Sequence, residues 1–556
     1  MLEILRLLIA LIAALVLPGL PFAILLAKER PSYWIPIYAS GLSLAINALV
    51  LLAFTELGVP FALVPLLAIY AASGLAAVLI LVKPARTSLI SSDSKLSTSG
   101  GWSLALLSLF LAVFFLRWLP LNSSTVILGI DTNHHVIITD LVLRNGAIPS
   151  DYEPYWGLSS FTYHFGFHAN AAAFSLLSGL PPHEAVSVLG LYLIALAPLS
   201  VFVLTATLFK SEQAALIAAV ITGLVSVFPA FYLNWGRFTQ LAAVVVVPLA
   251  MALLVDLHRS NPQRSTLIAA SLLVAGAFLV HYVMFVFLLY GVLALLAARL
   301  VETKSLKEVW SSIRRLIPVA VLAFVLVLPW LVTLLGSHLV GQVFTRDPGP
   351  PQLFSLVRIE EPLAYTSSLW IPVLALIGFG FLALFRKVEF TFLSVWSGLG
   401  LLFSNPHYVP GPLSGLLSTV TWVTIMFVFG SIFIAYIPAM GLAFVAHHRW
   451  LGRSLFALTV GMTVLLGTLG TGFISTEGYE AVHPQDLQAY DWIEENIPGE
   501  AVFATNVNID LFVETVQSVD GGIWITYFTG RKQLAPILIY ALESPSFPGY
   551  DEQLRQ

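Results

Sequence analysis

The recurrence of long apolar segments constrains this chain more than any other feature. Crossing the hydrocarbon layer of a bilayer takes about 20 mostly apolar residues, and about fourteen segments approach that length. Charged residues make up only 10% of the sequence, against about 25% in a soluble domain. The expected spans are 4–26, 32–54, 60–82, 102–119, 184–209, 213–233, 240–257, 266–280, 283–299, 316–335, 370–385, 389–403, 417–446 and 452–473. The sequence therefore predicts an all-α, multi-pass protein of the cell membrane.

Basic residues predict the orientation of these spans, because Lys and Arg accumulate in cytoplasmic loops. With the loops after odd-numbered spans placed inside, most of the 26 Lys and Arg residues become cytoplasmic. This arrangement requires that the apolar stretch 160–179 does not cross the membrane. We therefore expect one long outer loop, 120–183, with two amphipathic helices lying against the bilayer. Most of the 12 histidines then lie on or near the outer face, which favours an extracytoplasmic active site.

Composition divides the membrane part into three regions. Residues 1–83 are expected to form accessory N-terminal transmembrane helices, and the Ser- and Thr-rich stretch 84–101 a cytoplasmic linker. Residues 102–475 are expected to form the transmembrane core, with outer loops 120–183 and 336–369. The second loop is rich in Pro and Gly, which argues against regular structure and indicates a mobile flap.

The composition becomes that of a soluble protein over residues 476–556, which we expect to form a small α/β extracytoplasmic tail. Asp486 to Asn496 has helical spacing of apolar residues, and Ala501 to Thr505 has the composition of a short strand. The glycine run that begins at Asp520 predicts an ordinary turn and strand, with an aromatic surface for a bound chain as the alternative. About 80 residues are few for an independent core, so an incomplete domain stays open.

Asp131, His134 and His135 form the first candidate site, just outside the fourth expected span. The histidines follow the acid at helical spacing, so acid and imidazole can share one face. A carboxylate there can act as a general base on an acceptor hydroxyl, or hold a divalent cation together with a histidine. The structural alternative is an aspartate that caps a helix over 132–145.

Further candidates follow along the outer side. His164 and His168 lie four residues apart, a metal-ligand spacing without the glutamate of the zinc-protease pattern. Arg237, next to Trp235, offers a planar fork suited to a phosphate, with a snorkelling interfacial arginine as the alternative. His281 lies midway between two short spans, at the outer tip of a helical hairpin, as a ligand contact or a structural histidine.

Several chemistries are excluded by what the sequence lacks. The chain has no cysteine, which excludes disulfides, thiolate chemistry and cysteine-ligated metals. It also has no phosphate-cradling P-loop and no Rossmann glycine pattern, and we expect no nucleic-acid partner. The energy for a reaction must therefore come from an activated donor delivered through the membrane.

This arrangement resembles the GT-C superfamily of integral-membrane glycosyltransferases. The resemblance rests on Gly129-Ile130-Asp131, on Arg144-Asn145-Gly146-Ala147-Ile148-Pro149, on Tyr163-His164-Phe165-Gly166-Phe167-His168 and on Leu180-Pro181-Pro182-His183-Glu184. Trp492 to Pro498 and the run Asp520-Gly521-Gly522-Ile523-Trp524 are similar in order to the outer domain of oligosaccharyltransferase catalytic subunits. Those subunits carry Trp-Trp-Asp, whereas Val519 precedes the acid in this chain.

The resemblance implies a GT-C-like fold and the inverting transfer of a sugar from a polyprenyl-phosphate donor to an extracytoplasmic acceptor, which can be a glycan, a lipid or a protein. It implies Asp131 as the base and Glu153 as a second acid. It implies that Arg237 and one of His164, His168 and His281 hold the phosphate. Together with the candidates from the residues, the expected substrate-binding residues are His134, His135, His164, His168, Trp235, Arg237 and His281. Some members use a divalent cation (Mg or Mn), for which the candidate ligands are Asp131, His135, His164 and His168.

Two other functions stay open at this point. A lipid or glycan transporter or flippase would carry ionisable residues at mid-bilayer, whereas here they gather at the outer ends of the spans. A non-catalytic membrane scaffold would leave the acid and the histidines of the first outer loop without a role. An Asp131→Asn variant separates these functions. A glycosyltransferase should lose sugar transfer and still fold, whereas a scaffold should be unaffected. The donor sugar, the lipid chain and the acceptor are left open by the residues.

Overall fold

A computed structural model describes residues 2–82, 93–121, 127–259, 263–337, 370–404, 409, 416–445, 447–471, 479–510, 515–518, 520–534 and 543. Within these residues, nine helices are long and apolar enough to cross a membrane. A tenth is added if Glu3–Leu15 and Leu20–Leu26, which meet at a bend of 62°, count as one broken span. Most of the other expected spans correspond to shorter helices, so the structure shows a multi-pass helical protein but not the full number of about fourteen spans expected from length alone.

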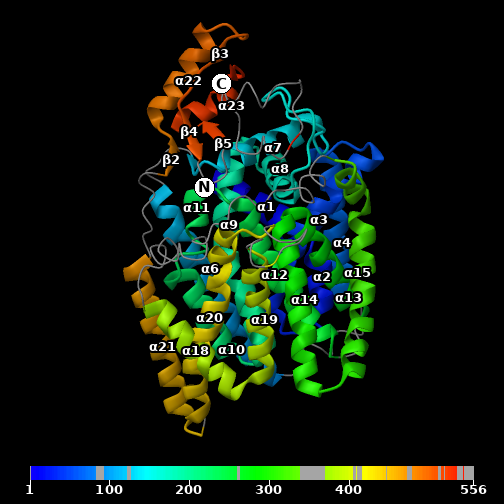
Figure 1. Ribbon diagram of the computed structural model, residues 1–556, viewed down its shortest axis with the longest axis vertical. Coiled ribbons are helices and arrows are strands. Elements are labelled where there is room, and N and C mark those ends of the chain that lie inside the picture. Colours follow the sequence, from blue (N-terminus) through cyan, green and yellow to red (C-terminus); the bar gives the residue numbers. More distant parts are fainter. Residues whose placement is uncertain are drawn as a thin grey trace.

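Figure 1 shows the helices as an elongated bundle with a small domain at one end. In chain order the helices of the bundle are α1 (Leu2–Leu15), α2 (Leu20–Leu26), η1 (Ser32–Trp34), α3 (Ile35–Leu57), α4 (Leu63–Val82), α6 (Asp93–Leu121), α7 (Thr132–Asn145), α8 (Gly166–Ser178), α9 (Pro182–Phe209), α10 (Glu212–Val220), η3 (Ile221–Val225), α11 (Tyr232–Trp235), α12 (Phe238–Leu257), α13 (Arg264–Val280), α14 (Tyr282–Thr303), α15 (Leu306–Leu335), α18 (Trp370–Phe385), α19 (Lys387–Phe403), α20 (Thr419–Phe444) and α21 (Arg449–Thr471).

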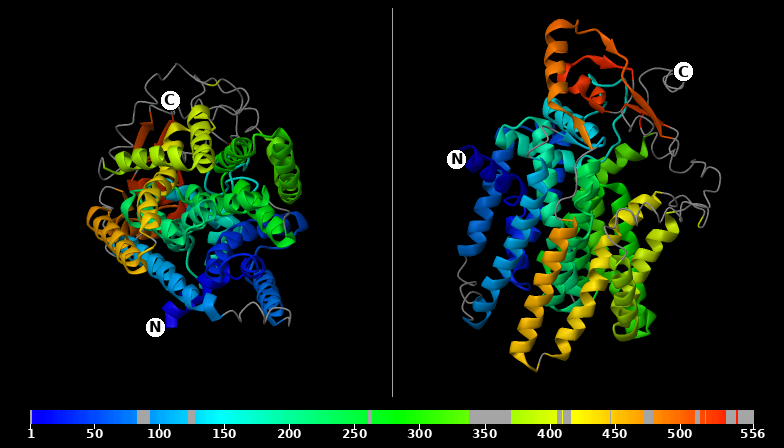
Figure 2. Two further views of the ribbon diagram at one scale, coloured as in Figure 1. Left: turned by 90° about the horizontal axis from the view of Figure 1, so that it is seen from below. Right: turned by 90° about the vertical axis from the view of Figure 1, so that its left-hand side faces the viewer.

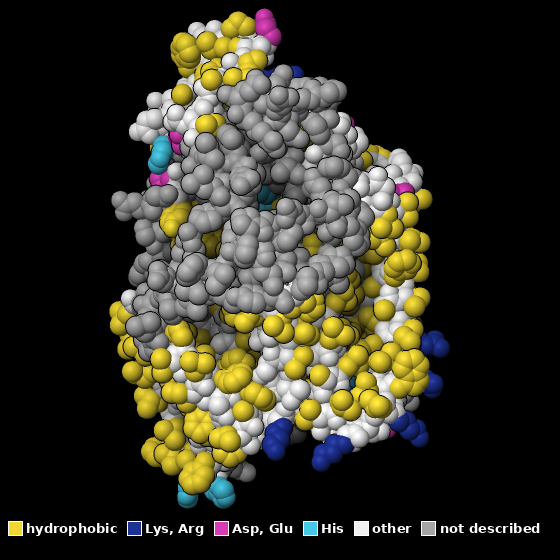
Figure 3. Space-filling model, in the orientation of Figure 1, with side chains coloured by type: hydrophobic (Ala, Val, Ile, Leu, Met, Phe, Trp, Pro, Cys, Tyr) yellow, Lys and Arg dark blue, Asp and Glu magenta, His cyan; other side chains and the backbone are white. Residues whose placement is uncertain are grey.

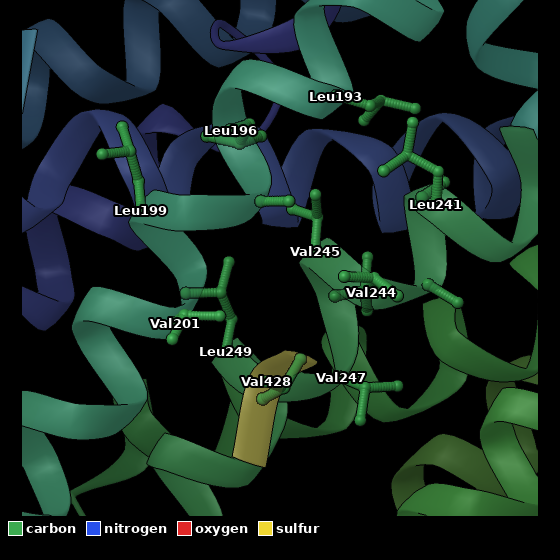
Figure 4. Close-up of a cluster of buried hydrophobic side chains, with 14 of the residues drawn as sticks. Leu193, Leu196, Leu199, Val201, Leu241, Val244, Val245, Val247, Leu249 and Val428 are labelled. Atoms are coloured by element: carbon green, nitrogen blue, oxygen red, sulfur yellow. The ribbon is translucent and has the colours of Figure 1, made fainter. Parts of the chain in front are cut away.

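Two helices form the centre of the bundle. The apolar window of α12 is 100% buried and that of α9 is 89% buried, against 17% for α4 and 6% for α21. A helix that is apolar on all sides lies either in a protein core or against lipid. The buried fraction assigns α9 and α12 to the core, whereas α4 and α21 are left exposed at the surface of the bundle. Leucine and valine side chains of α9 and α12 interdigitate with Val428 of α20 (Figure 4).

The N-terminal helices are joined to one another and to α8 by buried polar contacts. The Asn47 side chain on α3 donates to the carbonyl of Ala14 on α1 and to the Asn170 side chain on α8, both at 2.9 Å. It also accepts a bond of 2.9 Å from the Tyr70 hydroxyl on α4. Buried side-chain amides need such partners, and these partners bring four helices together at one residue.

The two helices of the first outer loop differ from the expectation. Residues Thr132 to Thr139 of α7 are all buried, as are Gly166 to Ser175 of α8. Neither helix is an amphipathic helix on the bilayer surface; both are enclosed by protein. Helix α8 has 13 residues, too few to cross a bilayer that needs about 20, so the stretch 160–179 contains no full helical span.

The tail forms a small α/β domain over the same end of the bundle as α7 and α8 (Figures 1 and 2). Its elements are β2 (Glu480–Val482), α22 (Pro484–Asn496), β3 (Val502–Phe503), β4 (Val507–Asp510), β5 (Thr515–Ser518), η4 (Asp520–Trp524), α23 (Ile525–Thr529) and β6 (Lys532–Gln533). The pairs β4–β5 and β1 (Ile127–Leu128)–β2 are antiparallel, and β3–β6 is parallel. Strand β1 precedes α7, so the tail is paired with the first outer loop.

The glycine run of the tail adopts helical turns rather than a turn and strand. Asp520 to Trp524 form η4, and α23 follows directly. Trp524 is fully buried, and Tyr490 stacks on Phe528 with ring centroids 5.0 Å apart. These aromatic side chains therefore build the core of the tail instead of an open surface for a bound chain.

The surface of the bundle agrees with a membrane environment. On the face shown in Figure 3, hydrophobic side chains cover the sides of the lower part, and Lys and Arg side chains gather toward the end away from the tail. We call the two ends of the bundle the tail end and the far end.

Candidate active site

Two glycines bring the first outer loop against the loop before α12. Gly129 has φ +80, and a Cβ placed on it would lie 2.4 Å from the carbonyl carbon of Trp235. Gly236 has φ +74, and a Cβ there would lie 2.5 Å from the amide nitrogen of Thr132. Both positions need glycine, because the left-handed conformation and the close backbone approach exclude a side chain. The two loops therefore interlock, and this places Asp131 beside Arg237.

Asp131 and Arg237 form an ion pair at the tail end. Arg237 Nε lies 3.5 Å from Asp131 Oδ2, and the side chains are 34% and 21% exposed. The guanidinium also lies over the ring of Trp235, 4.9 Å from its centroid. A long, partly exposed pair of this kind contributes little to stability, so both groups keep hydrogen-bonding capacity for a ligand.

The structural alternative for Asp131 is not supported by its geometry. Asp131 occupies the residue before α7, but its φ of −64° and ψ of −20° are helical and its side chain makes no capping hydrogen bond. The Thr132 hydroxyl turns back to the carbonyl of Leu128 at 2.5 Å instead. The carboxylate of Asp131 is therefore directed to Arg237 rather than to the helix.

Histidines from three parts of the chain meet behind this ion pair. His135 Nδ1 on α7 lies 3.0 Å from His168 Nε2 on α8, and His134 Nε2 lies 3.3 Å from the Tyr163 hydroxyl. Tyr163 stacks on His164 at 4.0 Å between ring centroids, and His164 lies 4.6 Å from His281. We call His134, His135, His164, His168 and His281 the histidine cluster.

Local packing positions the members of the cluster. Gly166 at the start of α8 lies so close to the end of α13 that a Cβ would meet the Leu279 carbonyl carbon at 2.9 Å. This contact places His164 beside His281. His281 has a structural role as well, since its Nδ1 accepts the backbone N–H of Met284 at 3.3 Å and begins α14. Capping occupies one nitrogen of the His281 ring.

Burial keeps the imidazoles neutral. It lowers the pKa of His134 to about 4, with the charge of Arg237 acting in the same direction and that of Asp131 opposing it. Burial also lowers the pKa of His164 and His168, and the neighbouring histidines add to the effect. Neutral imidazole offers one N–H donor and one acceptor, so the cluster can hydrogen-bond to a hydroxyl or a phosphate oxygen.

One ring nitrogen of the cluster is without a partner. His164 Nε2 is buried and forms no hydrogen bond within the described part of the chain. Buried polar atoms are nearly always paired in native proteins. This nitrogen is therefore a place where a ligand or water can bind.

Most of the predicted site residues are brought together, but Glu153 is not. Asp131, Trp235 and Arg237 meet directly. Burial is the main cause that lowers the pKa of His134 and of His281, and the charge of Arg237 adds to it in both cases. Glu153 is exposed, and its side chain makes no hydrogen bond or ion pair with any residue that the structure describes. A catalytic acid must come within about 3 Å of the reacting proton, so Glu153 is left out of the site proposed below.

The candidate metal ligands do not form a metal site. Among the described residues, no group of three or more His, Asp or Glu side chains is arranged to hold a metal ion. Of the four candidates, His135 and His168 are hydrogen-bonded to each other and Asp131 faces Arg237. This donor set does not fit a cation, and the mechanism below uses none.

Two residues of the surrounding structure carry no signal in the local sequence. Asn133 on α7 donates to the carbonyl of Ile523 in the tail at 3.2 Å. Glu543 in the tail is buried against the loop that precedes His164. No local motif marks either residue, because each contact joins segments far apart in the sequence. His338, His407 and residues 338–369 of the second outer loop, with Arg346, Arg358, Glu360 and Glu361, lie outside the described residues.

A family model with the description "Family of unknown function (DUF6541)" matches residues 12–513, most of the chain. The chain belongs to this family. Comparison with functionally curated proteins gives no match. The family description assigns no activity.

Solved structures resemble the chain in fold. The archaeal oligosaccharyltransferase AglB from Archaeoglobus fulgidus, in complex with an inhibitory peptide and a dolichol-phosphate, aligns with a TM-score of 0.50 and 15% identity over 80% of this chain and 61% of that protein. An oligosaccharyltransferase of Archaeoglobus fulgidus tethered with an acceptor peptide gives a TM-score of 0.51 and 12% identity, over 80% of this chain and 64% of that protein. ArnT from Cupriavidus metallidurans bound to undecaprenyl phosphate gives 0.48 and 14%, over 78% and 85%.

The likeness shows that the chain shares the fold of these membrane enzymes, which confirms the expected fold class. At these identities it shows the fold alone, because a fold does not fix a function. The chain spans about three fifths of the length of the archaeal oligosaccharyltransferase, of which 61% is covered.

Proposed function

We propose that this chain is a membrane glycosyltransferase that moves a sugar from a polyprenyl-phosphate-linked donor to an acceptor on the tail side of the membrane. The observation that carries the proposal is the Asp131–Arg237 pair, held by two interlocking glycines beside the buried histidine cluster. A carboxylate, a cation and uncharged donors lie together where the bundle meets the tail. The oligosaccharyltransferase of the same fold was solved with a dolichol-phosphate, which supports a lipid-phosphate donor.

Asp131 is the general base in this mechanism. Its carboxylate takes the proton from the acceptor hydroxyl, and the oxygen attacks the anomeric carbon of the donor sugar. The bond from that carbon to the phosphate oxygen breaks, and its electron pair leaves with the polyprenyl phosphate. Attack opposite the leaving group inverts the anomeric configuration. General-base catalysis of this kind typically contributes about 10²–10⁴ in rate.

Arg237 and the histidine cluster hold the phosphate. A guanidinium has five N–H donors in a planar fork, so Arg237 can bind two phosphate oxygens while its Nε stays near Asp131. His164 adds a hydrogen bond from Nε2, and the absence of another partner for this nitrogen within the described residues supports that role. These donors stabilise the charge that develops on the leaving phosphate in the transition state.

Asp131→Asn tests the assignment because it removes the base and keeps the shape. The purified chain in nanodiscs is given a labelled polyprenyl-phosphate sugar with total membrane lipid and envelope glycans as acceptors, and release of polyprenyl phosphate is measured. We expect wild type to release it and Asp131→Asn to do so at least about 100-fold more slowly.

Asp140→Asn, on the same helix but paired with Arg144 and Tyr155, is the matched control and should stay close to wild type. Binding of polyprenyl phosphate, followed by native mass spectrometry, should survive Asp131→Asn and weaken about tenfold or more in Arg237→Gln, which loses a charge-assisted contact. Equal activity of wild type and Asp131→Asn would reject the mechanism. A wild type that neither binds nor releases polyprenyl phosphate would reject the function.

A further inference from the structure

Glu543 is a buried carboxylate that the mechanism above does not use. It is only 4% exposed and accepts four hydrogen bonds from the loop before α8. Oε1 accepts the backbone N–H of Thr162 at 2.8 Å and the Tyr152 hydroxyl at 3.3 Å. Oε2 accepts the hydroxyls of Ser160 at 2.8 Å and Thr162 at 3.1 Å.

The donors around Glu543 are all uncharged. No Lys or Arg of the described chain forms an ion pair with it. Burial raises the pKa of Glu543, and the bonds from Thr162, Ser160 and Tyr152 oppose that rise. Placing a carboxylate away from water is unfavourable unless its oxygens are hydrogen-bonded, and here both oxygens have two donors each. The loop is therefore shaped around a carboxylate at this point.

Thr162 is the link between Glu543 and the site. Its carbonyl accepts the Tyr282 hydroxyl at 3.0 Å, and that hydroxyl in turn accepts the indole N–H of Trp330 at 2.7 Å. Glu543 thus holds Thr162 from one side and α14 holds it from the other. The next two residues are Tyr163, which reaches His134, and His164, which lies against His281.

We propose that Glu543 is a positioning residue of the active site. Its carboxylate fixes Thr162 and thereby sets the places of Tyr163 and His164, although it touches no substrate itself. The proposal rests on the function given above only for the role of His164 as a phosphate ligand. The positioning of the His164 ring is independent of any activity and can be measured by itself.

The test compares Glu543→Ala with Glu543→Gln in the full chain. A glutamine keeps the shape: its carbonyl accepts from Thr162 and Tyr152, and its NH₂ donates to hydroxyls that can turn to accept. The first readout is the rate at which diethyl pyrocarbonate modifies His164, followed by peptide mass spectrometry. The exposed His447 and His448 report the reagent concentration in the same digest.

We expect Glu543→Ala to raise the modification rate of His164 by about tenfold, since the loop opens locally without its anchor, and Glu543→Gln to stay within about threefold of wild type. Glu495→Ala, which removes an exposed carboxylate of the tail, should change nothing. In the transfer assay, Glu543→Ala should raise the KM for the lipid donor more than it lowers kcat, because His164 contacts the phosphate.

Thr162→Val keeps the bond from the backbone N–H to Glu543 and removes only the bond from the hydroxyl. This variant replaces Glu543→Ala if Glu543→Ala does not fold. It should give a smaller rise in the labelling of His164. Unchanged labelling of His164 in both variants overturns the proposal. Raised labelling in a protein that transfers no sugar supports the positioning of His164 while rejecting the proposed function, so the two failures are distinguishable.

Discussion

The two ends of the bundle use charge in different ways. At the far end, Arg30 lies 2.9 Å from Asp256, and Arg299 lies 2.9 Å from both Glu302 and Glu308. At the tail end, Arg237 is 3.5 Å from its acid, and within the described residues the histidine cluster forms no ion pair. The far end uses short ion pairs of its arginines to join helices. The tail end combines a longer ion pair with a cluster of neutral histidines, and that difference separates a structural network from a candidate ligand site.

The largest loss of activity is expected from a substitution at Gly236, where two backbone segments of the tail end approach closely. Gly236→Ala puts a methyl group 2.5 Å from the Thr132 amide nitrogen and must push the two loops apart. A displacement of about 1 Å at reacting groups can lower a rate about 100-fold, so we expect at least that loss of sugar transfer. The measurement is release of polyprenyl phosphate at saturating donor.

Gly58→Ala is the control for this prediction. Gly58 also has a positive φ, +66, but an added Cβ there meets nothing within 4 Å. The two variants carry similar backbone strain, and only Gly236→Ala disturbs the site. Equal activities of the two variants would show that the interlocked glycines do not position Asp131.

At the far end, Arg30→Met should change stability and leave binding unchanged. The Arg30 side chain is only 6% exposed, whereas Asp256 is 35% exposed and keeps Lys210 at 3.6 Å. Loss of the pair should destabilise the fold by about 1–3 kcal/mol, discounted for the exposure of Asp256. Thermal unfolding in detergent measures this, and native mass spectrometry should show wild-type binding of polyprenyl phosphate. Weakened binding would mean that the two ends are coupled.

Acid should destabilise the tail end through its histidines. The unfolded chain takes up a proton at His134 near the ordinary pKa of 6.5, while the folded chain does so only near 4. Stability is therefore lost as the pH falls below 6.5, by about 2 kcal/mol from His134 at pH 5. The apparent Tm between pH 7 and pH 5 should fall less in His134→Gln than in wild type. His448→Gln, at an exposed histidine, should keep the wild-type slope. A wild-type Tm that does not change over this range would contradict the prediction.

The smallest effect is expected at the rim of the far end. Glu302 pairs with Arg299 at 2.9 Å and with Arg259 at 3.8 Å, and it is 34% exposed. Pairs of this exposure contribute about 0–1 kcal/mol, so Glu302→Gln should shift the Tm only slightly and less in high salt. A shift as large as that of Arg30→Met would show that the network acts as a unit.

The fold could be predicted where the signal is local. Runs of apolar residues marked the helices of the bundle, and the spacing of apolar side chains in Asp486 to Asn496 predicted α22 with its end at the same residue. The burial of α7 and α8 could not be predicted in this way. Both were expected at a bilayer surface, and only the packing of distant helices around them shows that their polar side chains face protein.

The residue types of the candidate site could be predicted from the sequence, but most of the contacts between them could not. Asp131, Arg237 and the histidines stand out because ionisable groups are rare in such an apolar chain. Glu153 stood out for the same reason, but it lies exposed, and within the described residues its side chain has no hydrogen bond or ion pair with the others. Gly236 and Glu543 could not be recognised, because their roles consist of contacts with Thr132 and Thr162, which are distant in the sequence.

The pairing of β1 with β2 connects the tail to the segment that carries Asp131. Ile127 lies opposite Val482, and the amide of Gly129 donates to the carbonyl of Tyr479 at 2.9 Å, two residues before Asp131. A displacement of the tail would therefore be passed through this ladder to the backbone next to Asp131, the proposed base.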